Sequence, residues 1–401
     1  MKYNADDLKQ RFEAAYNAKN LWYANYLNAY NYVIPNRDAQ NIWNEYTGEA
    51  RNNTIRIYNQ TPVRAARERC AQLQSLIFPS QFTWGKITPH FSQDENIPLL
   101  NMIDWDKLND TIGNYIKDSN LQSVASSMLL DLTVGSCGVW IDSPSDHHPL
   151  NFTTIPGLLI IPEHTDETLI RTVWFKRQVL NRTLLESYPA YRGEQYKTLR
   201  ENLNEVSYIY IGQIFDPVKH SYMLYGVLRG DEDHPLFHYE KPYPQLIVGR
   251  EFVRPGEVES RGVATELLES ILDLNKMSED FLKGNSLRFR PPIFYNDDTG
   301  FNSGRTPNLT GAFLPRLGGN LPLEVMHIPP APEAFNYIQI RETEIKEFFQ
   351  VDPLGSLELP VRSASEMEIR EERAQRTSAT DLARLINELP KQIYLTSTSR
   401  S

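Results

Sequence analysis

The first third of the chain shows the periodicity of amphipathic helices. Apolar residues recur every three or four positions over residues 6–32. Thr61 and Pro62 predict the start of a second helix, because threonine caps helices and proline fits their first turn. Pro79 ends that segment, and a third helical run covers residues 105–132. The pattern predicts three helices before residue 135, with the arginines of the second one, including Arg69, away from its apolar stripe.

The pattern changes after residue 138 to short runs rich in β-branched and aromatic residues, separated by proline, glycine and aspartate. The clearest strand-like runs are residues 158–161, 171–179, 206–214, 221–228 and 245–248. Residues 181–188 form a short helical segment between two of them. Together with the preceding helices, these runs predict an α+β body of about 250 residues.

The last third returns to helical periodicity, with a long interruption. Residues 262–283 have one apolar face and one charged face, and residues 333–350 repeat the arrangement. The intervening residues 285–332 are rich in proline, glycine and asparagine. Because structureless loops of that length are uncommon, we expect this insertion to have structure or a partner of its own. After a break near Asp352, residues 363–366 have the sequence of a capping box and predict another helix.

Composition narrows the class of protein. The 401 residues are enough for two or three structural units. No stretch of about 20 apolar residues is available to span a bilayer, and we expect no secretory signal at the start. A net charge of −10 disfavours a protein that wraps nucleic acid through a basic surface. The two cysteines are too few for a disulfide framework or a four-cysteine zinc site.

Candidate catalytic residues are few. Cys137 lies in the turn 135–138 and could be an exposed nucleophile, but no neighbour would lower its pKa, so we favour a buried thiol. The sequence contains neither a phosphate-binding glycine loop ending in Gly-Lys-Ser/Thr nor a His-Glu-x-x-His motif. We therefore expect no cofactor and no enzymatic activity.

Candidate metal ligands are equally weak. His147 and His148 are adjacent in a loop, where histidines are usually solvated. His234 and His238 have helical spacing, but the intervening Pro235 argues against a helix. Residues 296–300 resemble the start of a calcium loop that lacks its final acidic ligand, so we interpret them as a turn. We predict no metal site.

The two long helices of the last third are acidic. Residues 257–283 contain seven acidic and three basic residues, and residues 333–352 contain five acidic and two basic ones. These could be ordinary solvated faces. They acquire a functional meaning if many copies of the chain turn the helices toward one shared space.

Four stretches in fixed order resemble the portal (head-to-tail connector) proteins of tailed bacteriophages, in particular those of short-tailed podoviruses. Each is weakly specific alone, and together they span about 300 residues. They are residues 61–67, residues 131–138, residues 260–276 with Pro291-Pro292 following, and residues 363–367 with Arg370 and Glu371.

This resemblance implies a ring of twelve identical subunits around a DNA channel. It implies the following division: wing 1–255, first stem helix 256–284, clip 285–332, second stem helix 333–352, tunnel loop 353–362, and a long helix 363–401 toward the crown. Relatives usually continue further, so the crown is either short or lies beyond residue 401.

The same resemblance assigns three groups of residues. The tunnel loop would face DNA with Leu354, Ser356, Leu357, Glu358 and Leu359. The stem would line the channel with Glu266, Glu269, Asp273, Asp280, Glu342, Glu344 and Glu347. The clip would contact partners through Arg288, Arg290, Asp297, Asp298, Arg305 and Arg316. Because acidic walls repel phosphates, such a channel would let DNA slide without adhering.

The implied partners are further copies of the chain, double-stranded DNA, the terminase packaging motor, the tail adaptor, and the major capsid and scaffolding proteins, with no membrane. The implied location is the portal vertex of the virion, after assembly in the host bacterial cytoplasm. Two alternatives remain at this stage: another connector or adaptor ring of the virion, and a soluble α+β enzyme such as a hydrolase.

Overall fold

The computed structural model describes most of the chain. The described residues are 5–35, 55–79, 85–87, 104–142, 150–163, 170–231, 233–254, 257–296, 313–316, 323–325, 327, 329, 332–349 and 383–398. The mixture of helices and antiparallel sheets confirms the predicted α+β class. The tunnel-loop residues Leu354, Ser356, Leu357, Glu358 and Leu359 lie outside the described residues, as does the predicted helix start at 363–366.

Four helices open the chain: α1 (Ala5–Val33), α2 (Thr61–Ile77), α3 (Trp105–Asp118) and α4 (Leu121–Leu132). The predictions for α1 and α2 are confirmed, except that Thr61 lies inside α2 and Gln60 precedes it. The single helix predicted over residues 105–132 is wrong, because it is interrupted at Ser119. The Ser119 hydroxyl donates to the Ile116 carbonyl and accepts from the Leu121 amide, so it replaces helical hydrogen bonds there.

Two antiparallel sheets form the rest of the body. The smaller has the order β2-β1-β8 and consists of β1 (Ser136–Asp142), β2 (Asn151–Pro156) and β8 (Leu246–Arg250). The larger has the order β3-β4-β5-β6-β7 and consists of β3 (Ile160–Pro162), β4 (Val173–Leu180), β5 (Val206–Asp216), β6 (Ser221–Leu228) and β7 (Phe237–Lys241). Two short helices, α5 (Asn181–Ser187) and α6 (Tyr196–Glu201), connect β4 to β5.

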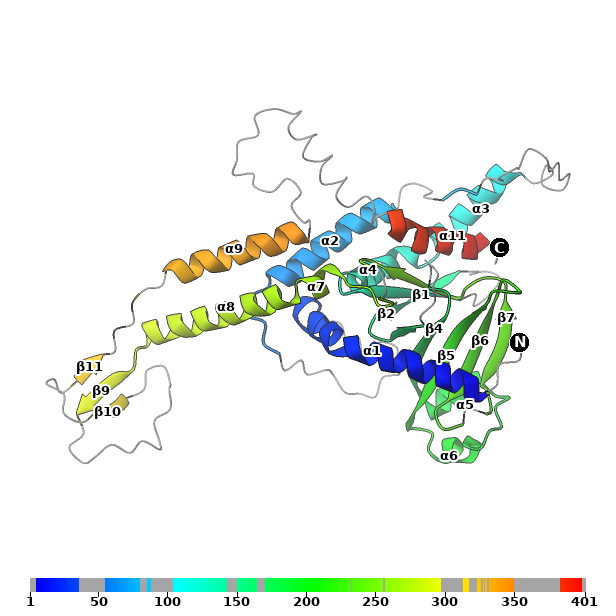
Figure 1. Cartoon of the computed structure of the whole chain (residues 1–401), viewed down its shortest axis with the longest axis horizontal. Coiled ribbons are helices and arrows are strands. Elements are labelled where there is room, and N and C mark those ends of the chain that lie inside the picture. The colour runs from blue at the N-terminus through cyan, green and yellow to red at the C-terminus, as the bar shows by residue number, and fades with distance from the viewer. Residues whose placement is uncertain are drawn as a thin grey trace.

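The core of the body lies between the early helices and the small sheet. Met128 and Leu132 of α4 pack with Val139 of β1 and are fully buried. The C-terminal helix α11 (Pro390–Thr398) returns to the same core with Ile393 and Tyr394. The two ends of the chain are therefore part of one folded body (Figure 1).

A pair of helices projects from this body (Figure 1). A short helix α7 (Val263–Glu266) is followed by α8 (Leu268–Phe289), and α9 (Pro332–Phe348) runs beside α8. The sequence predicts one helix over 262–283. That prediction is wrong at Leu267, where the backbone leaves helical geometry, and α8 extends six residues further. The break follows from the binding of α7 to the end of α4, where the Ala264 amide donates to the Thr133 carbonyl.

The insertion between α8 and α9 has structure of its own, as predicted. At the far end of the helix pair, β9 (Ile293–Asn296) lies between β10 (Phe313–Arg316) and β11 (Leu323–Val325). The β9–β10 pairing is parallel and the β9–β11 pairing is antiparallel. No helix in the described part of the chain is long and apolar enough to cross a membrane.

Candidate nucleic-acid interface on a projecting helix pair

The helix pair α8/α9 is held together by apolar side chains along its length. Ile271 and Leu274 of α8 and Ile338 and Ile345 of α9 are buried in one cluster. Nearer to β9–β11, the ring centroids of Phe281 and Phe335 lie 6.2 Å apart. These apolar contacts keep α9 alongside α8 and determine which side of each helix points away from the other helix.

Two of the predicted lining residues on α8 are exposed carboxylates without an ion pair to any described residue. Glu269 and Asp273 are one helical turn apart, on the side of α8 opposite to the buried Ile271 and Leu274. Two others are neutralised. Glu266, the last residue of α7, pairs with Arg254 at 2.9 Å and with Arg261 at 3.6 Å, and Asp280 of α8 pairs with Lys276 at 3.1 Å.

The predicted lining residues on α9 also differ from one another. Glu342 accepts a hydrogen bond of 2.7 Å from the Asn59 side chain, and Glu344 pairs with Arg341 at 2.8 Å. Glu347 is exposed and has no ion pair to a described residue. Four of the seven predicted carboxylates therefore have no ion pair to a described residue; Glu342 is hydrogen-bonded to the neutral Asn59, and Glu269, Asp273 and Glu347 are exposed and unpaired.

The root of the helix pair contains a buried ionic cluster that the sequence analysis missed. Arg69 of α2 is 7% exposed, so its predicted place away from the apolar stripe is wrong. Its guanidinium pairs with Glu251 and donates a hydrogen bond of 3.1 Å to the Phe349 carbonyl at the end of α9. Glu251 in turn accepts a bond of 3.2 Å from the Val263 amide at the start of α7. Each charge thus meets the helix end that its sign stabilises.

The C-terminal segment joins the same cluster. Glu388 accepts from the Arg250 amide at 2.9 Å and pairs with the Arg250 guanidinium at 2.7 Å. Burial raises the pKa of Glu388, and Arg250 opposes that rise. Arg384 donates to the Glu251 carbonyl. Residues on both sides of the undescribed stretch 350–382 are therefore fastened to Arg250 and Glu251.

A second buried pair attaches α1 to the segment that precedes the helix pair. Lys19 lies 2.7 Å from Glu259, and the Tyr26 hydroxyl donates to the same carboxylate at 3.1 Å. Burial lowers the pKa of Lys19, and Glu259 works against that shift. Burial and the charge of Glu259 together raise the pKa of Tyr26. The ion pair and the tyrosine keep α1 at the base of the projection.

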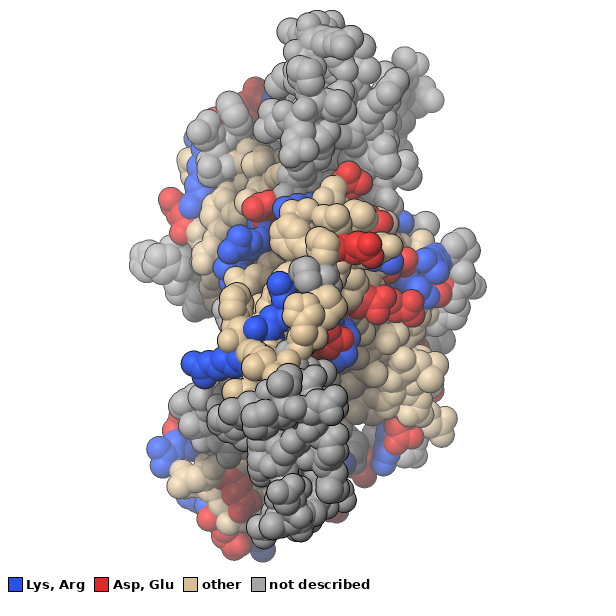
Figure 2. Space-filling view, turned by 90° about the vertical axis from the view of Figure 1, so that its left-hand side faces the viewer, with Lys and Arg blue, Asp and Glu red and all other residues tan. Residues whose placement is uncertain are grey.

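The structure describes only some of the six residues that the sequence assigns to partner contacts of the clip. Arg288 lies in the last turn of α8 and Arg290 directly follows it, and both are exposed. Asp297, Asp298 and Arg305 lie outside the described residues, and Arg316 belongs to β10. Seen from the end that carries β9–β11, charges of both signs are interspersed over the described surface (Figure 2).

The weak metal candidates do not converge. His234 lies 2.6 Å from Asp231, whereas His238 is on β7 and lies 3.1 Å from the Met223 sulfur. His147 and His148 lie outside the described residues. Among the residues that the structure places, no group of three His, Cys, Asp or Glu side chains could hold a metal ion.

Both thiols should be unreactive in the native protein. Cys137 is fully buried in β1 and Cys70 is buried in α2, and burial raises the pKa of each thiol, which disfavours the nucleophilic thiolate. We expect no reaction with 5,5′-dithiobis(2-nitrobenzoic acid) at about pH 8 without denaturant, and two thiols per chain in guanidinium chloride. Rapid native labelling of Cys137 would restore the nucleophile hypothesis.

A comparison with known families agrees with this architecture. Residues 5–202, from α1 through α6, match the model of a family described as bacteriophage head to tail connecting protein. No curated protein matches the sequence. The matched region covers much of the body and contains two of the four stretches that carry the sequence resemblance, residues 61–67 and 131–138, whereas the helix pair lies beyond it. Over residues 5–202, just under half of its length, the chain is therefore similar to bacteriophage head-to-tail connecting proteins, which supports its recognition as a phage connector.

Proposed function

We propose that copies of this chain close into a ring at one vertex of the capsid of a short-tailed phage, through which double-stranded DNA is packaged and ejected. The observation that carries the proposal is the helix pair α8/α9, which projects from the body and ends in a separate small sheet. In this assignment α8 and α9 are the stem and β9–β11 belong to the clip. Twelve copies are the number expected from the family resemblance.

An exposed apolar stripe on α9 supports assembly through the stem. Tyr337, Ile340 and Phe348 lie on one side of the helix and are 61%, 53% and 47% exposed. Apolar side chains in such a row are commonly covered by another protein surface. In a ring the cover is a different face of the neighbouring copy, because each subunit repeats the same heterologous contact until the ring closes.

The three unpaired stem carboxylates support a non-adhesive channel. Glu269 and Asp273 face away from the stem core, and Glu347 borders the α9 stripe. Repeated in every copy and turned toward the bore, they would repel phosphates that occur about every 1.7 Å along duplex DNA. A lining of one sign acts most strongly in a concave tunnel, where low-dielectric walls focus the field. DNA could then slide in both directions.

The remaining assignments complete this proposal. The clip, with Arg288 and Arg290 exposed at its base, would meet the terminase motor during packaging and the tail adaptor afterwards. The tunnel loop 353–362 would contact the passing DNA, and the body would contact capsid and scaffolding proteins. The described residues that flank the tunnel loop in sequence, Phe349 on one side and Arg384 and Glu388 on the other, are held at Arg250 and Glu251, directly or through Arg69.

The experiment that tests the ring is imaging of the purified full chain end-on, combined with Ile340→Asp. A carboxylate placed in a buried apolar contact must lose its hydration, so we expect the concentration at which rings form to rise by about 30-fold. Native mass spectrometry gives the subunit number. Val218→Asp, which adds the same charge in an exposed turn, is the matched control.

Rings of unchanged stability in Ile340→Asp would remove α9 from the interface. Monomers alone at every concentration, in the unmodified chain and in assembled heads, would refute the proposed function. Circular dichroism of Ile340→Asp separates loss of assembly from loss of folding.

A further inference from the structure

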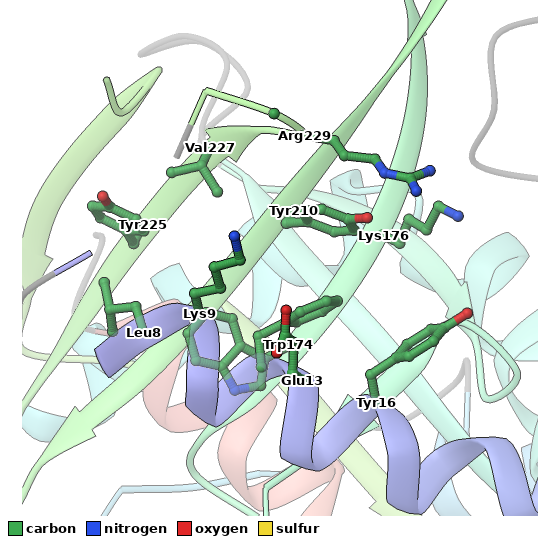
Figure 3. A pocket seen from close by; sticks show the side chains of 12 residues that line it. Leu8, Lys9, Glu13, Tyr16, Trp174, Lys176, Tyr210, Tyr225, Val227 and Arg229 are labelled. Carbon is green, nitrogen blue, oxygen red and sulfur yellow. The ribbon is translucent and has the colours of Figure 1, made fainter. Parts of the chain in front are cut away.

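A long groove runs between α1 and the large sheet, at the end of the body away from the stem. Its deeper part is a cavity of about 490 Å³ lined by α1 and by residues of β4, β5 and β6 (Figure 3). A neighbouring cavity of about 460 Å³ continues along α1 toward Tyr23. Tyr16 and Lys176 line both cavities, so the two adjoin along α1, and we refer to them together as the groove.

The floor of the groove is aromatic and rigid. The ring centroid of Phe12 lies 4.6 Å from that of Tyr210 and 5.9 Å from that of Trp174. Trp174 is 3% exposed and packs directly over Gly212, where a β-carbon would collide with the indole. The aromatic faces are therefore used within the protein, while the space above them is open to an apolar side chain.

The rim of the groove carries excess positive charge. Among the described residues that line the deeper cavity, Lys9, Lys176 and Arg229 are basic, and Glu13 is the one acidic residue. Lys9 rises from α1 across the cavity, while Lys176 and Arg229 lie at one end of it, both near the ring of Tyr208 (Figure 3). None of these three cations pairs with a carboxylate of a described residue.

Lys176 is the least solvated of these cations, because it is half-buried whereas Lys9 and Arg229 are exposed. The Lys176 ammonium lies 3.9 Å above the Tyr208 ring, and its pKa is lowered by burial and further by Arg229. In a chain with 51 acidic and 41 basic residues, carboxylates were available to neutralise this end of the groove. An external anion would relieve the repulsion between Lys176 and Arg229.

We propose that this groove binds an extended acidic peptide segment of a different protein, with one apolar or aromatic side chain inserted above Phe12 and Tyr210. Carboxylates on the segment would meet Lys176 and Arg229 at the rim. The groove follows α1 from Leu8 to Tyr23, which is about 22 Å of helix. An extended peptide covers that length with about seven residues.

The groove is less suited to nucleic acid. Single-stranded nucleic acid is usually bound by bases that stack on exposed aromatic faces, whereas Trp174 is buried and the half-buried Phe12 already packs against Tyr210 and Trp174. Glu13 in the lining would repel a phosphate backbone. An acidic peptide needs no aromatic stacking surface, and its carboxylates can lie beside Lys176 and Arg229 and away from Glu13.

The test uses a fluorescein-labelled peptide of about nine residues with one phenylalanine among aspartates and glutamates, long enough to span the groove. Fluorescence anisotropy with the full chain should show saturable binding. Arg229→Glu should weaken it by about tenfold, because the substitution replaces an attractive rim charge by a repulsive one. Lys197→Glu makes the same charge change on the exposed surface of α6 and should leave binding unchanged.

Three further measurements keep the test decisive. A peptide with alanine in place of phenylalanine should bind more weakly, and equal binding would overturn the insertion of a side chain. A ten-nucleotide oligothymidylate should not compete, and tighter, Arg229-dependent binding of it would show a nucleic-acid site instead. A change in oligomer size caused by Arg229→Glu would show that a second copy occupies the groove. Arg229→Ala provides the same comparison if the charge reversal prevents folding.

Discussion

Glu251→Gln should lower the free energy of unfolding by about 3–5 kcal/mol. The substitution keeps the shape of the side chain and an oxygen that can accept from the Val263 amide, and it removes the charge that balances Arg69. Arg69 then remains buried with no counter-charge in this pair, and desolvating an uncompensated cation is costly. Arg69→Met should cost a similar amount and also removes the donor to the Phe349 carbonyl.

Urea unfolding followed by circular dichroism measures this effect. The double variant should lose less unfolding free energy than the sum of the losses in the two single variants, because each single substitution already breaks the same ion pair. Asp106→Asn is the matched control. It breaks the solvent-exposed Lys86–Asp106 pair and should leave the midpoint unchanged. A Glu251→Gln protein as stable as the original chain would show that the stem root does not depend on this ion pair.

Helices were predictable from the sequence because their signal is local. The periodic apolar positions of α1, α2 and α9 locate each helix to within two or three residues at its ends. The exceptions have a local cause that periodicity cannot register. Ser119 diverts hydrogen bonds from the helix to its own hydroxyl, and Leu267 marks the point where contacts with α4 redirect the chain.

Strands were predictable where they are strongly apolar. The boundaries of β6 agree with the run predicted for it. The strand β5 is two residues longer than its own predicted run, 206–214. The prediction missed β2 and β7, whose residues include several polar ones and whose pairing partners supply much of their stability. A strand such as β7 exists because β6 offers an edge to it, which is information outside its own five residues.

Charge at the stem was predictable as a total and not as a distribution. Counting acidic residues gives the correct sign for α8 and α9, but Glu266 is neutralised by Arg254, from a loop twelve residues earlier. Arg69 shows the opposite error: the sequence pattern places it away from the apolar stripe like the other arginines of α2, and nothing in the local sequence signals that it is buried. Its partner Glu251 is 182 residues away in the chain. Pairings over such distances are fixed by the fold and are not encoded in local spacing.

Reversing the unpaired stem charges should convert a non-adhesive channel into a DNA trap. With Glu269→Lys and Asp273→Lys in every copy, lysines would replace carboxylates on the side of α8 that we assign to the bore. The original ring should bind linear duplex DNA weakly. Glu266 is left unchanged, because its pairs with Arg254 and Arg261 make it part of the stem structure.

The strongest evidence would come from the salt dependence of DNA binding by the double variant. Each phosphate that a lysine neutralises steepens the slope of log K against log salt by about 0.9. With about six such contacts, affinity should fall about 10³-fold between roughly 50 and 200 mM salt. Glu186→Lys with Glu201→Lys adds the same charge on exposed parts of α5 and α6 and is the matched control. Equal slopes for the two variants would place Glu269 and Asp273 outside the bore, whereas a steep slope confined to the stem variant would assign the DNA path to α8.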